Sequence, residues 1–271
     1  MELYFAESGP ADAPTILFVH GGGGAGWNWA PQVEALTSHY HCLVPDLPEQ
    51  GRSLAVGPFT MADATARLTD LIRRRAHGGR AHVVGLSLGA QLTVNVLSQA
   101  PELINRAIVS SALLRPLPFA GLYRPNVLAA SFRWGVAPFQ ASRWYARLNM
   151  RHAAGIPEQY FSQFWEDYQR LTADSFAHVV AENMAFRQPP GLERARLPVL
   201  VVVGRQEYAP MHASARDLLK ALPEARGVIV DVGRSLAENH NWNLNAPELF
   251  TRMVRAWLTA QPLPAELAPL T

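Results

Sequence analysis

The residue with the clearest chemical potential in this chain is Ser87, the centre of a Gly-x-Ser-x-Gly pattern at residues 85–89. An apolar run precedes the pattern, and residues 89–100 continue without a helix breaker. A serine held on a sharp turn between a strand and a helix leaves no room for side chains two positions away, and Gly85 and Gly89 remove them. The helix N-terminus beneath such a serine favours developing negative charge. The pattern therefore predicts a nucleophile, with an ordinary loop serine as the alternative.

Two titratable residues, Glu207 and His240, are placed to complete a catalytic group with Ser87. Each follows an apolar run with strand character, at residues 197–203 and 228–232. In an open parallel sheet the carboxyl ends of the strands face one crevice, so residues far apart in sequence can converge there. The chain order of nucleophile, acid and histidine suits a general-base histidine that a carboxylate orients.

Plainer interpretations of these residues also exist. Taken alone, His240 is a surface loop histidine and Glu207 a solvated carboxylate. Asp217 and Asp231 compete with Glu207 as the acid, but one falls in a helical stretch and the other inside a strand. A carboxylate just beyond the end of a strand is better placed for the crevice, so we favour Glu207.

A glycine-rich loop at residues 20–26 follows the first buried strand and has two possible uses. Its glycines fit the dinucleotide fingerprint G-x-G-x-x-G, and Asp46 lies at the distance expected for the ribose-binding acid. The third glycine of that fingerprint opens a helix, whereas here Trp27 and Trp29 follow and would obstruct a pyrophosphate. We therefore favour an oxyanion hole, in which glycines let a backbone N–H point into the site that the serine shares.

Apolar periodicity predicts the elements that must position these residues. A strand ends at the Ser87 turn, an amphipathic helix covers residues 61–75, and the polar turn at residues 46–53 has a structural role. Further strands are predicted at residues 2–7, 15–19, 42–45, 106–110, 197–203 and 228–232. The alternation of strand and helix predicts an α/β fold with a mostly parallel central sheet and helices on both faces.

The pattern changes between residues 113 and 188, where strand signals vanish and aromatic residues accumulate. Helical stretches are expected near residues 121–137, 141–153, 157–171 and 173–187. We therefore predict a core domain at residues 1–112 and 189–271, interrupted by an all-helical cap at residues 113–188. Most of the aromatic side chains must pack these helices, and a minority should line an apolar pocket over the site. The candidates for substrate binding are Trp27, Trp29, Trp134 and Trp165.

These ordered motifs together resemble the α/β-hydrolase fold family in its capped form, over essentially the whole chain. The motifs are His20-Gly21 with Trp29 nine residues on, residues 46–53, residues 85–89, residues 204–210 and His240. The resemblance implies that Ser87 is the nucleophile, His240 the general base and Glu207 its orienting acid. It also implies that the backbone N–H groups of Gly22 and Leu88 form the oxyanion hole.

Three positions depart from the family pattern. Glu207 stands where this branch usually has aspartate, Glu49 replaces a glycine of the turn after Asp46, and Asn239 replaces the glycine that commonly precedes the histidine. Glutamate serves as the acid in other members, so the triad stays plausible. The other two replacements leave the geometry of their loops undetermined by sequence.

The chemistry that the resemblance implies is acyl transfer by a serine esterase of the carboxylesterase type, acting on small to medium apolar esters through an acyl-enzyme. No metal and no organic cofactor is expected. Three alternatives on the same scaffold stay open: carbon–carbon bond hydrolysis or lyase chemistry, cofactor-free perhydrolysis, and a ligand-sensing receptor with a slow triad.

Composition bounds the setting of the protein. The chain has 271 residues, 49% of them hydrophobic, and a formal net charge of +2. Its basic residues are mostly scattered, so we expect no nucleic-acid partner. The single cysteine, Cys42, indicates a reducing compartment, and no run of eighteen apolar residues suggests a membrane span. We expect a cytoplasmic enzyme with a small apolar ester-like substrate and no membrane partner, and a homodimer stays open.

Overall fold

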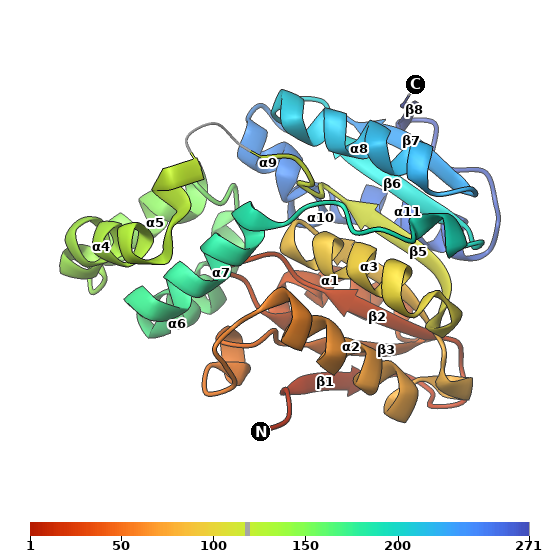
Figure 1. Ribbon diagram of the computed structural model, residues 1–271, viewed down its shortest axis with the longest axis horizontal. Helices are drawn as coiled ribbons and strands as arrows, with labels where there is room; N and C mark the ends of the chain where they lie inside the picture. The colour runs from red at the N-terminus through yellow and green to blue at the C-terminus, as the bar shows by residue number, and fades with distance from the viewer. Residues whose placement is uncertain (117–119, 271) are drawn as a thin grey trace.

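The computed structural model describes residues 1–116 and 120–270, and an eight-stranded sheet lies at its centre (Figure 1). The spatial order is β1-β3-β2-β4-β5-β6-β7-β8. Only the edge strands β1 and β8 pair antiparallel with their neighbours; the six between them are parallel. The bounds are β1 Phe5–Ser8, β2 Thr15–Val19, β3 His41–Pro45, β4 Ala81–Leu86, β5 Ile104–Ser110, β6 Val199–Gly204, β7 Ala225–Val230 and β8 Ala268–Pro269. The mostly parallel sheet predicted from the sequence is confirmed.

Helices cover both faces of the sheet because successive side chains of a buried strand point to opposite sides. In β2, Leu17 and Val19 join one core cluster, and Ile16 and Phe18 join the other. The first cluster packs α2 (Met61–Arg75), α3 (Leu88–Gln99) and α8 (Ala209–Ala221) on the sheet. The second packs α1 (Ala30–Leu36) and α11 (Pro247–Leu258) on the opposite face. The short helices α9 (Leu236–His240) and α10 (Trp242–Asn245) lie between β7 and α11.

Four further helices lie between β5 and β6 and project from one end of the sheet (Figure 1). They are α4 (Pro125–Gly135), α5 (Arg143–His152), α6 (Phe161–Arg170) and α7 (Ala173–Ala185). Two small clusters stabilise them, one between α4 and α7 and one between α5 and α6. The division into a core and a cap remains our prediction, and residues 117–119 of the predicted cap lie outside the described residues.

The observed bounds of the strands and helices agree with the sequence prediction for some elements and differ for others. The predicted bounds of β2 and α2 are those observed, whereas β7 begins and ends earlier than predicted. After Gly26 the chain does enter a 3₁₀ turn (Gly26–Trp29) and then α1, so the expectation of no helix there is wrong. Within the described ranges, none of the helices combines the length and apolar content that crossing a bilayer requires.

Candidate active site

Ser87 occupies the turn between β4 and α3 with φ 56° and ψ −115°. Residues other than glycine rarely adopt a positive φ, and such strain is a common feature of functional sites. The turn closes only because two neighbours lack side chains. A Cβ on Gly85 would lie 2.3 Å from the carbonyl oxygen of Gly89, and a Cβ on Gly89 would lie 2.1 Å from that of Val19. Both distances are well inside van der Waals contact, so the backbone crossing requires glycine.

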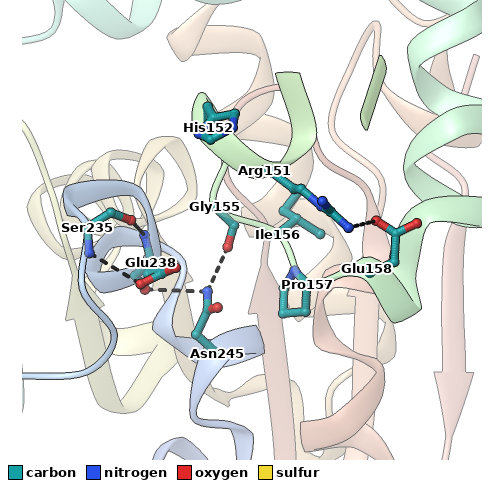
Figure 2. A pocket seen from close by; sticks show the side chains of 9 residues that line it. All are labelled: Arg151, His152, Gly155, Ile156, Pro157, Glu158, Ser235, Glu238 and Asn245. Atoms are coloured by element: carbon teal, nitrogen blue, oxygen red, sulfur yellow. Dashed lines mark hydrogen bonds and ion pairs between the residues drawn. The ribbon is translucent and has the colours of Figure 1, made fainter. Parts of the chain in front are cut away.

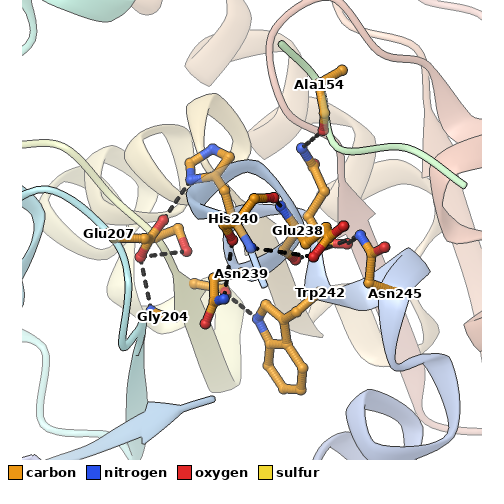
Figure 3. Close-up of polar contacts among 12 residues, drawn as sticks. Ala154, Gly204, Glu207, Glu238, Asn239, His240, Trp242 and Asn245 are labelled. Carbon is orange, nitrogen blue, oxygen red and sulfur yellow. Dashed lines mark hydrogen bonds and ion pairs between the residues drawn. The ribbon is translucent and has the colours of Figure 1, made fainter. Parts of the chain in front are cut away.

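Glu207 and His240, which are 33 positions apart, meet beyond the carboxyl ends of β6 and β7 (Figure 3). The distance between His240 Nδ1 and Glu207 Oε1 is 2.5 Å. The side chain of Glu207 is 1% exposed and that of His240 is 25% exposed. When ionised, a carboxylate only accepts hydrogen bonds, so Nδ1 carries the proton and Nε2 is left as the basic nitrogen. This is the tautomer that a general base needs.

The Glu207 carboxylate accepts two more hydrogen bonds that fix its orientation. Its Oε2 atom accepts from the backbone N–H of Gly204 at 2.8 Å and from the Ser111 hydroxyl at 3.1 Å. Ser111 follows β5 directly and has φ 61°. Sequence reasoning missed Ser111, although a polar residue at the end of a core strand was a usable signal.

Asn239, one of the departures from the family pattern, stabilises α9, the short helix that ends at His240. It is fully buried in α9, and its Nδ2 donates to the carbonyl oxygens of Val232 and Ser235 at 2.5 and 3.1 Å. The Asn239 Cβ lies 2.9 Å from where a Cβ on Gly204 would stand. Gly204 therefore leaves the space that Asn239 occupies, directly behind Glu207.

The glycine loop lies against the Ser87 turn. A Cβ on Gly21 would lie 3.3 Å from the Cβ of Ser87, and one on Gly22 would lie 3.6 Å from Leu88 Cδ2. The two segments that were predicted to supply the oxyanion donors, at Gly22 and Leu88, are therefore in contact. Among the contacts of the described residues there is no hydrogen bond from Ser87 to His240, and such catalytic bonds are often long before substrate binds.

The polar turn after β3 holds the glycine loop in place. Asp46 Oδ1 accepts from the backbone N–H of Gly26 at 2.6 Å, and Gln50 Oε1 accepts from that of Gly23 at 2.7 Å. Both acceptors are buried. The structural role predicted for this turn is thus what its contacts provide.

His20 is fully buried at the start of the glycine loop and serves as a fixed hydrogen-bonding link. Its Nε2 accepts from the backbone N–H of Leu47 at 3.0 Å, which leaves Nδ1–H to donate to the carbonyl oxygen of Gly21 at 2.8 Å. Burial lowers the pKa of His20, opposed by the nearby charge of Asp46, so the ring is neutral. A neutral ring with one donor and one acceptor matches both partners.

The four tryptophans predicted to bind substrate fall into three environments. Trp29 is fully buried in the core between Phe18 and Phe250, so it does not line a pocket. Trp134 is 84% exposed on α4 and forms no enclosed wall. Trp27 and Trp165 are half-buried in the cluster between the core and α5–α6. Only Trp27 and Trp165 therefore stay candidates for substrate binding. The prediction was wrong for the other two because the sequence does not show which aromatic residues are buried in the core or exposed on the surface.

Trp27 joins the core to the helical insertion. Its Nε1–H donates to Asp167 Oδ2 of α6 at 2.7 Å, and its ring stacks on Tyr160 at 6.1 Å between centroids. Burial raises the pKa of Asp167, while the hydrogen bond from Trp27 lowers it. Substitution of Trp27 therefore changes this junction as well as any pocket.

Helix α7 presents residues to the site that sequence reasoning missed. Val179 Cγ1 and Asn183 Nδ2 lie 3.4 and 3.7 Å from where a Cβ on Gly22 would stand. The helix is fixed there because Gln91 Nε2 donates to the carbonyl oxygen of Asn183 at 3.0 Å. No motif marks these positions, since only the packing of α7 brings them to the glycine loop.

Glu49, the remaining departure from the family pattern, anchors the same helix. It has φ 59°, which explains why glycine is usual at this position. Its carboxylate accepts from the backbone N–H of Phe59 at 2.9 Å and lies 2.9 Å from Nδ1 of His178 on α7. The replacement of glycine by glutamate therefore adds a polar link between the core and α7.

A cavity of about 380 Å³ lies between the α5–α6 connection and the short helices α9 and α10 (Figure 2). Its lining is mostly polar, so it differs from the apolar pocket that the sequence predicted. The lining residues are Arg151, His152, Gly155, Ile156, Pro157, Glu158, Ser235, Glu238 and Asn245. Asn245 Nδ2 crosses it to donate to the carbonyl oxygen of Gly155 at 2.7 Å. The connection between α5 and α6 is thus tied to α10, the short helix that follows His240 in the chain.

Comparisons with known proteins agree with the observed fold. The model of the "Alpha/beta hydrolase family" matches residues 16–253. A protein of Gibberella zeae named "AB hydrolase superfamily protein" is 29% identical over 96% of this chain and 85% of its own. Carboxylesterase YbfK of Bacillus subtilis is 25% identical over 95% of this chain and 84% of its own. Among solved structures, the enol-lactonase from Burkholderia xenovorans LB400 has a TM-score of 0.72 at 23% identity, covering 95% of this chain and 96% of that one.

Proposed function

Because the chain belongs to the α/β-hydrolase family, we propose that it is a serine hydrolase that cleaves carboxylic esters of small to medium apolar substrates through an acyl-enzyme intermediate. The observation that carries this proposal is the 2.5 Å hydrogen bond between His240 and the buried Glu207, together with a serine on a strained turn at the same end of the sheet. The similarity to a protein named carboxylesterase supports the ester as the substrate class.

The first half of the reaction transfers the acyl group to the enzyme. Ser87 Oγ attacks the ester carbonyl while His240 Nε2 takes its proton, and Glu207 stabilises the imidazolium that forms. The N–H groups of Gly22 and Leu88 hold the oxyanion, assisted by the N-terminus of α3. The ester C–O bond then breaks, and the alcohol leaves with the proton from His240.

The second half returns the enzyme to its starting state. A water molecule attacks the acyl-enzyme while His240 takes its proton, and the carboxylic acid is released as Ser87 is reprotonated. Val179 and Leu88 are buried beside Gly22, so the surroundings of the proposed oxyanion donors include apolar side chains. In this proposal α4 to α7 act as the cap that shields the site from water.

The first test is Ser87→Ala. We expect it to abolish p-nitrophenyl acetate hydrolysis while the circular dichroism spectrum and melting temperature stay close to wild type, because the nucleophile is lost and only weak residual catalysis remains, on the order of 10³–10⁴-fold over water. An organophosphate should add to wild type at one site, which peptide mass spectrometry should locate at Ser87. Ser162→Ala, on the exposed surface of α6, is the matched control and should keep full activity. Wild-type turnover in the Ser87 variant would contradict the assignment.

The other chemistries on this scaffold are separated by substrate and acceptor. A panel of esters, lactones and C–C hydrolase substrates should rank esters first by kcat/KM. A perhydrolase should also use hydrogen peroxide as the acyl acceptor, and a receptor should give one acylation burst with no steady turnover. If Ser87 is acylated and the enzyme either uses peroxide as the acceptor or shows a burst without turnover, Ser87 stays the nucleophile but the proposed activity is wrong.

A further inference from the structure

The helices α4 and α5 expose an unusual amount of apolar surface. Nine large apolar side chains are exposed among the described residues, and six of them lie between residues 122 and 148. Trp134 is 84% exposed, Trp144 is 71% exposed and Phe139 is 52% exposed. The other three are Leu122, Val127 and Leu148. Exposed apolar side chains that are concentrated in one part of the fold indicate an interaction surface, whereas single scattered ones do not.

The exposed side chains on α4 and α5 are not the ones that pack these helices on their neighbours. Helix α4 packs on α7 through a different face, where Leu128 and Ala129 cluster with Ala177 and the Phe132 ring lies 5.5 Å from that of Phe176. Helix α5 likewise buries its own inner residues, Ala146 and Met150, against α6. The exposed tryptophans therefore belong to second, outer faces for which the chain provides no cover among its described residues.

Helix α5 contacts the end of α4 and the turn that follows it. The Tyr145 hydroxyl of α5 donates to the carbonyl oxygen of Gly135 at the end of α4, at 2.9 Å, and the Phe139 ring between them lies 5.1 Å from that of Tyr145. Figure 1 shows both helices at the left end of the molecule, away from the sheet. We call residues 121–152 the α4–α5 hairpin.

The charged residues of the hairpin are all basic. It holds five arginines and no aspartate or glutamate, whereas the whole chain has a net charge of only +2, so the rest of the chain carries −3. Asp174 and Glu158 pair with three of the arginines, which leaves the hairpin and these two partners with three net positive charges. The arginines are Arg124, Arg133, Arg143, Arg147 and Arg151.

We propose that the α4–α5 hairpin binds the surface of an anionic lipid membrane. Tryptophan and phenylalanine favour the boundary between headgroups and acyl chains, and arginine is attracted to anionic headgroups, so exposed aromatics beside an acid-free run of arginines match this surface. The chain lies on the bilayer and does not span it. This departs from our expectation from sequence that the protein has no membrane partner, and it does not depend on the proposed ester chemistry.

A second copy of the chain is the less suitable occupant. In a two-fold dimer the same face of each protomer meets its equivalent, so the positive hairpins would be brought together. Like charges placed opposite each other oppose association. An anionic bilayer supplies both the apolar layer and the opposite charge.

The test is sedimentation with sucrose-loaded vesicles of phosphatidylcholine alone or with one quarter phosphatidylglycerol. We expect at least about tenfold stronger binding to the anionic vesicles, largely lost when salt rises from about 0.1 M to about 1 M, since the Debye length falls from about 10 Å to about 3 Å. Trp134→Ser combined with Trp144→Ser should weaken binding at least about tenfold. Tyr208→Ser is the matched control and should bind as wild type. It removes an aromatic side chain that is 63% exposed at the start of α8, outside the hairpin.

A second variant separates a local effect from loss of folding. Arg124→Gln combined with Arg133→Gln keeps the tryptophans and should also weaken binding and flatten its salt dependence. Equal binding to both vesicle types, no binding to either, or binding that both double variants retain would overturn the proposal. A concentration-dependent dimer in analytical ultracentrifugation that the tryptophan variant abolishes, without vesicle binding, would assign the hairpin to a second copy instead.

Discussion

The change Glu207→Gln tests the proposed acid with almost no change in shape. In the wild type three donors converge on the carboxylate: the Nδ1–H of His240, the Ser111 hydroxyl and the Gly204 N–H. An amide has one oxygen to accept with and an NH₂ group that only donates. At least one of the three donors must therefore lose its acceptor. Gly204 and Ser111 share one carboxylate oxygen and His240 contacts the other, so we expect the NH₂ group to face the ring of His240.

The consequence for catalysis follows from the tautomer. If the NH₂ group of the new side chain donates to His240 Nδ1, the ring proton moves to Nε2, which can then no longer take a proton from Ser87. The same change of tautomer in a serine protease triad lowers kcat by about 10⁴-fold. At about 1.36 kcal/mol for each tenfold change, we expect a loss of roughly 5 kcal/mol of transition-state stabilisation. The lost charge-assisted hydrogen bond should also destabilise the fold by about 1.5–3 kcal/mol.

The assay is steady-state hydrolysis of p-nitrophenyl acetate, with urea unfolding of the same samples. We expect kcat to fall about 10⁴-fold with little change in KM, since Glu207 is proposed to act through His240 and not on the substrate. Asp231→Asn is the matched control: this carboxylate is half-exposed, pairs with Arg205 at 2.7 Å, and should matter less than about twofold. If Asp231→Asn is the more damaging change, or if Glu207→Gln keeps kcat within tenfold, the assignment of the acid is refuted.

Three further predictions concern the substrate and the fold. Across p-nitrophenyl esters from acetate to palmitate, kcat/KM should rise by up to about fourfold for each methylene until the site is full, because each buried methylene contributes about 0.8 kcal/mol; a flat profile, or a preference for a charged or the longest ester, would contradict an apolar acyl site. Gly89→Ala should lower the melting temperature or prevent folding, because its Cβ would lie 2.1 Å from the carbonyl oxygen of Val19, while Gly135→Ala, whose Cβ meets open space, should be tolerated. Burial lowers the pKa of His82 to about 4 from 6.5, so between those pH values the unfolded chain binds a proton that the folded chain does not, and urea unfolding should show stability falling as pH drops through this window. His82→Phe should flatten that dependence, and an unchanged slope would show that other groups cause it.

Among the helices inserted between β5 and β6, α7 differs from α4 and α5 in its contacts with the sheet and its covering helices. Glu182 of α7 accepts from the backbone N–H of Met61 at 2.7 Å, and His178 of the same helix contacts Glu49. The α4–α5 hairpin, by contrast, exposes Trp134 and Trp144 on its outer faces, while Arg143 and Arg147 lie over aromatic rings of α6. The structure thus combines one helix that borders the proposed site with a pair of helices that present an outer surface.

Local signals in the sequence were sufficient for the fold class and for the Ser87 turn. An apolar run, a glycine pair and a breaker-free helix are short-range features, and the sharp turn at Ser87 closes only with glycine two positions away on each side. The same holds for β2 and α2, whose periodicity alone defines their bounds. The pairing of Glu207 with His240 was also predictable, because parallel strands place their carboxyl ends at one edge.

Only the tertiary structure decided which aromatic side chains are core, surface or junction. Residue type alone does not separate Trp29, Trp134 and Trp27, yet they are fully buried, 84% exposed and half-buried at a junction. The reason is physical: burial of a side chain depends on which long-range elements pack against it, and periodicity within one helix cannot report that. For the same reason no sequence motif marked Val179 and Asn183, because α7 acquires its neighbours at the glycine loop only when the inserted helices pack on the sheet.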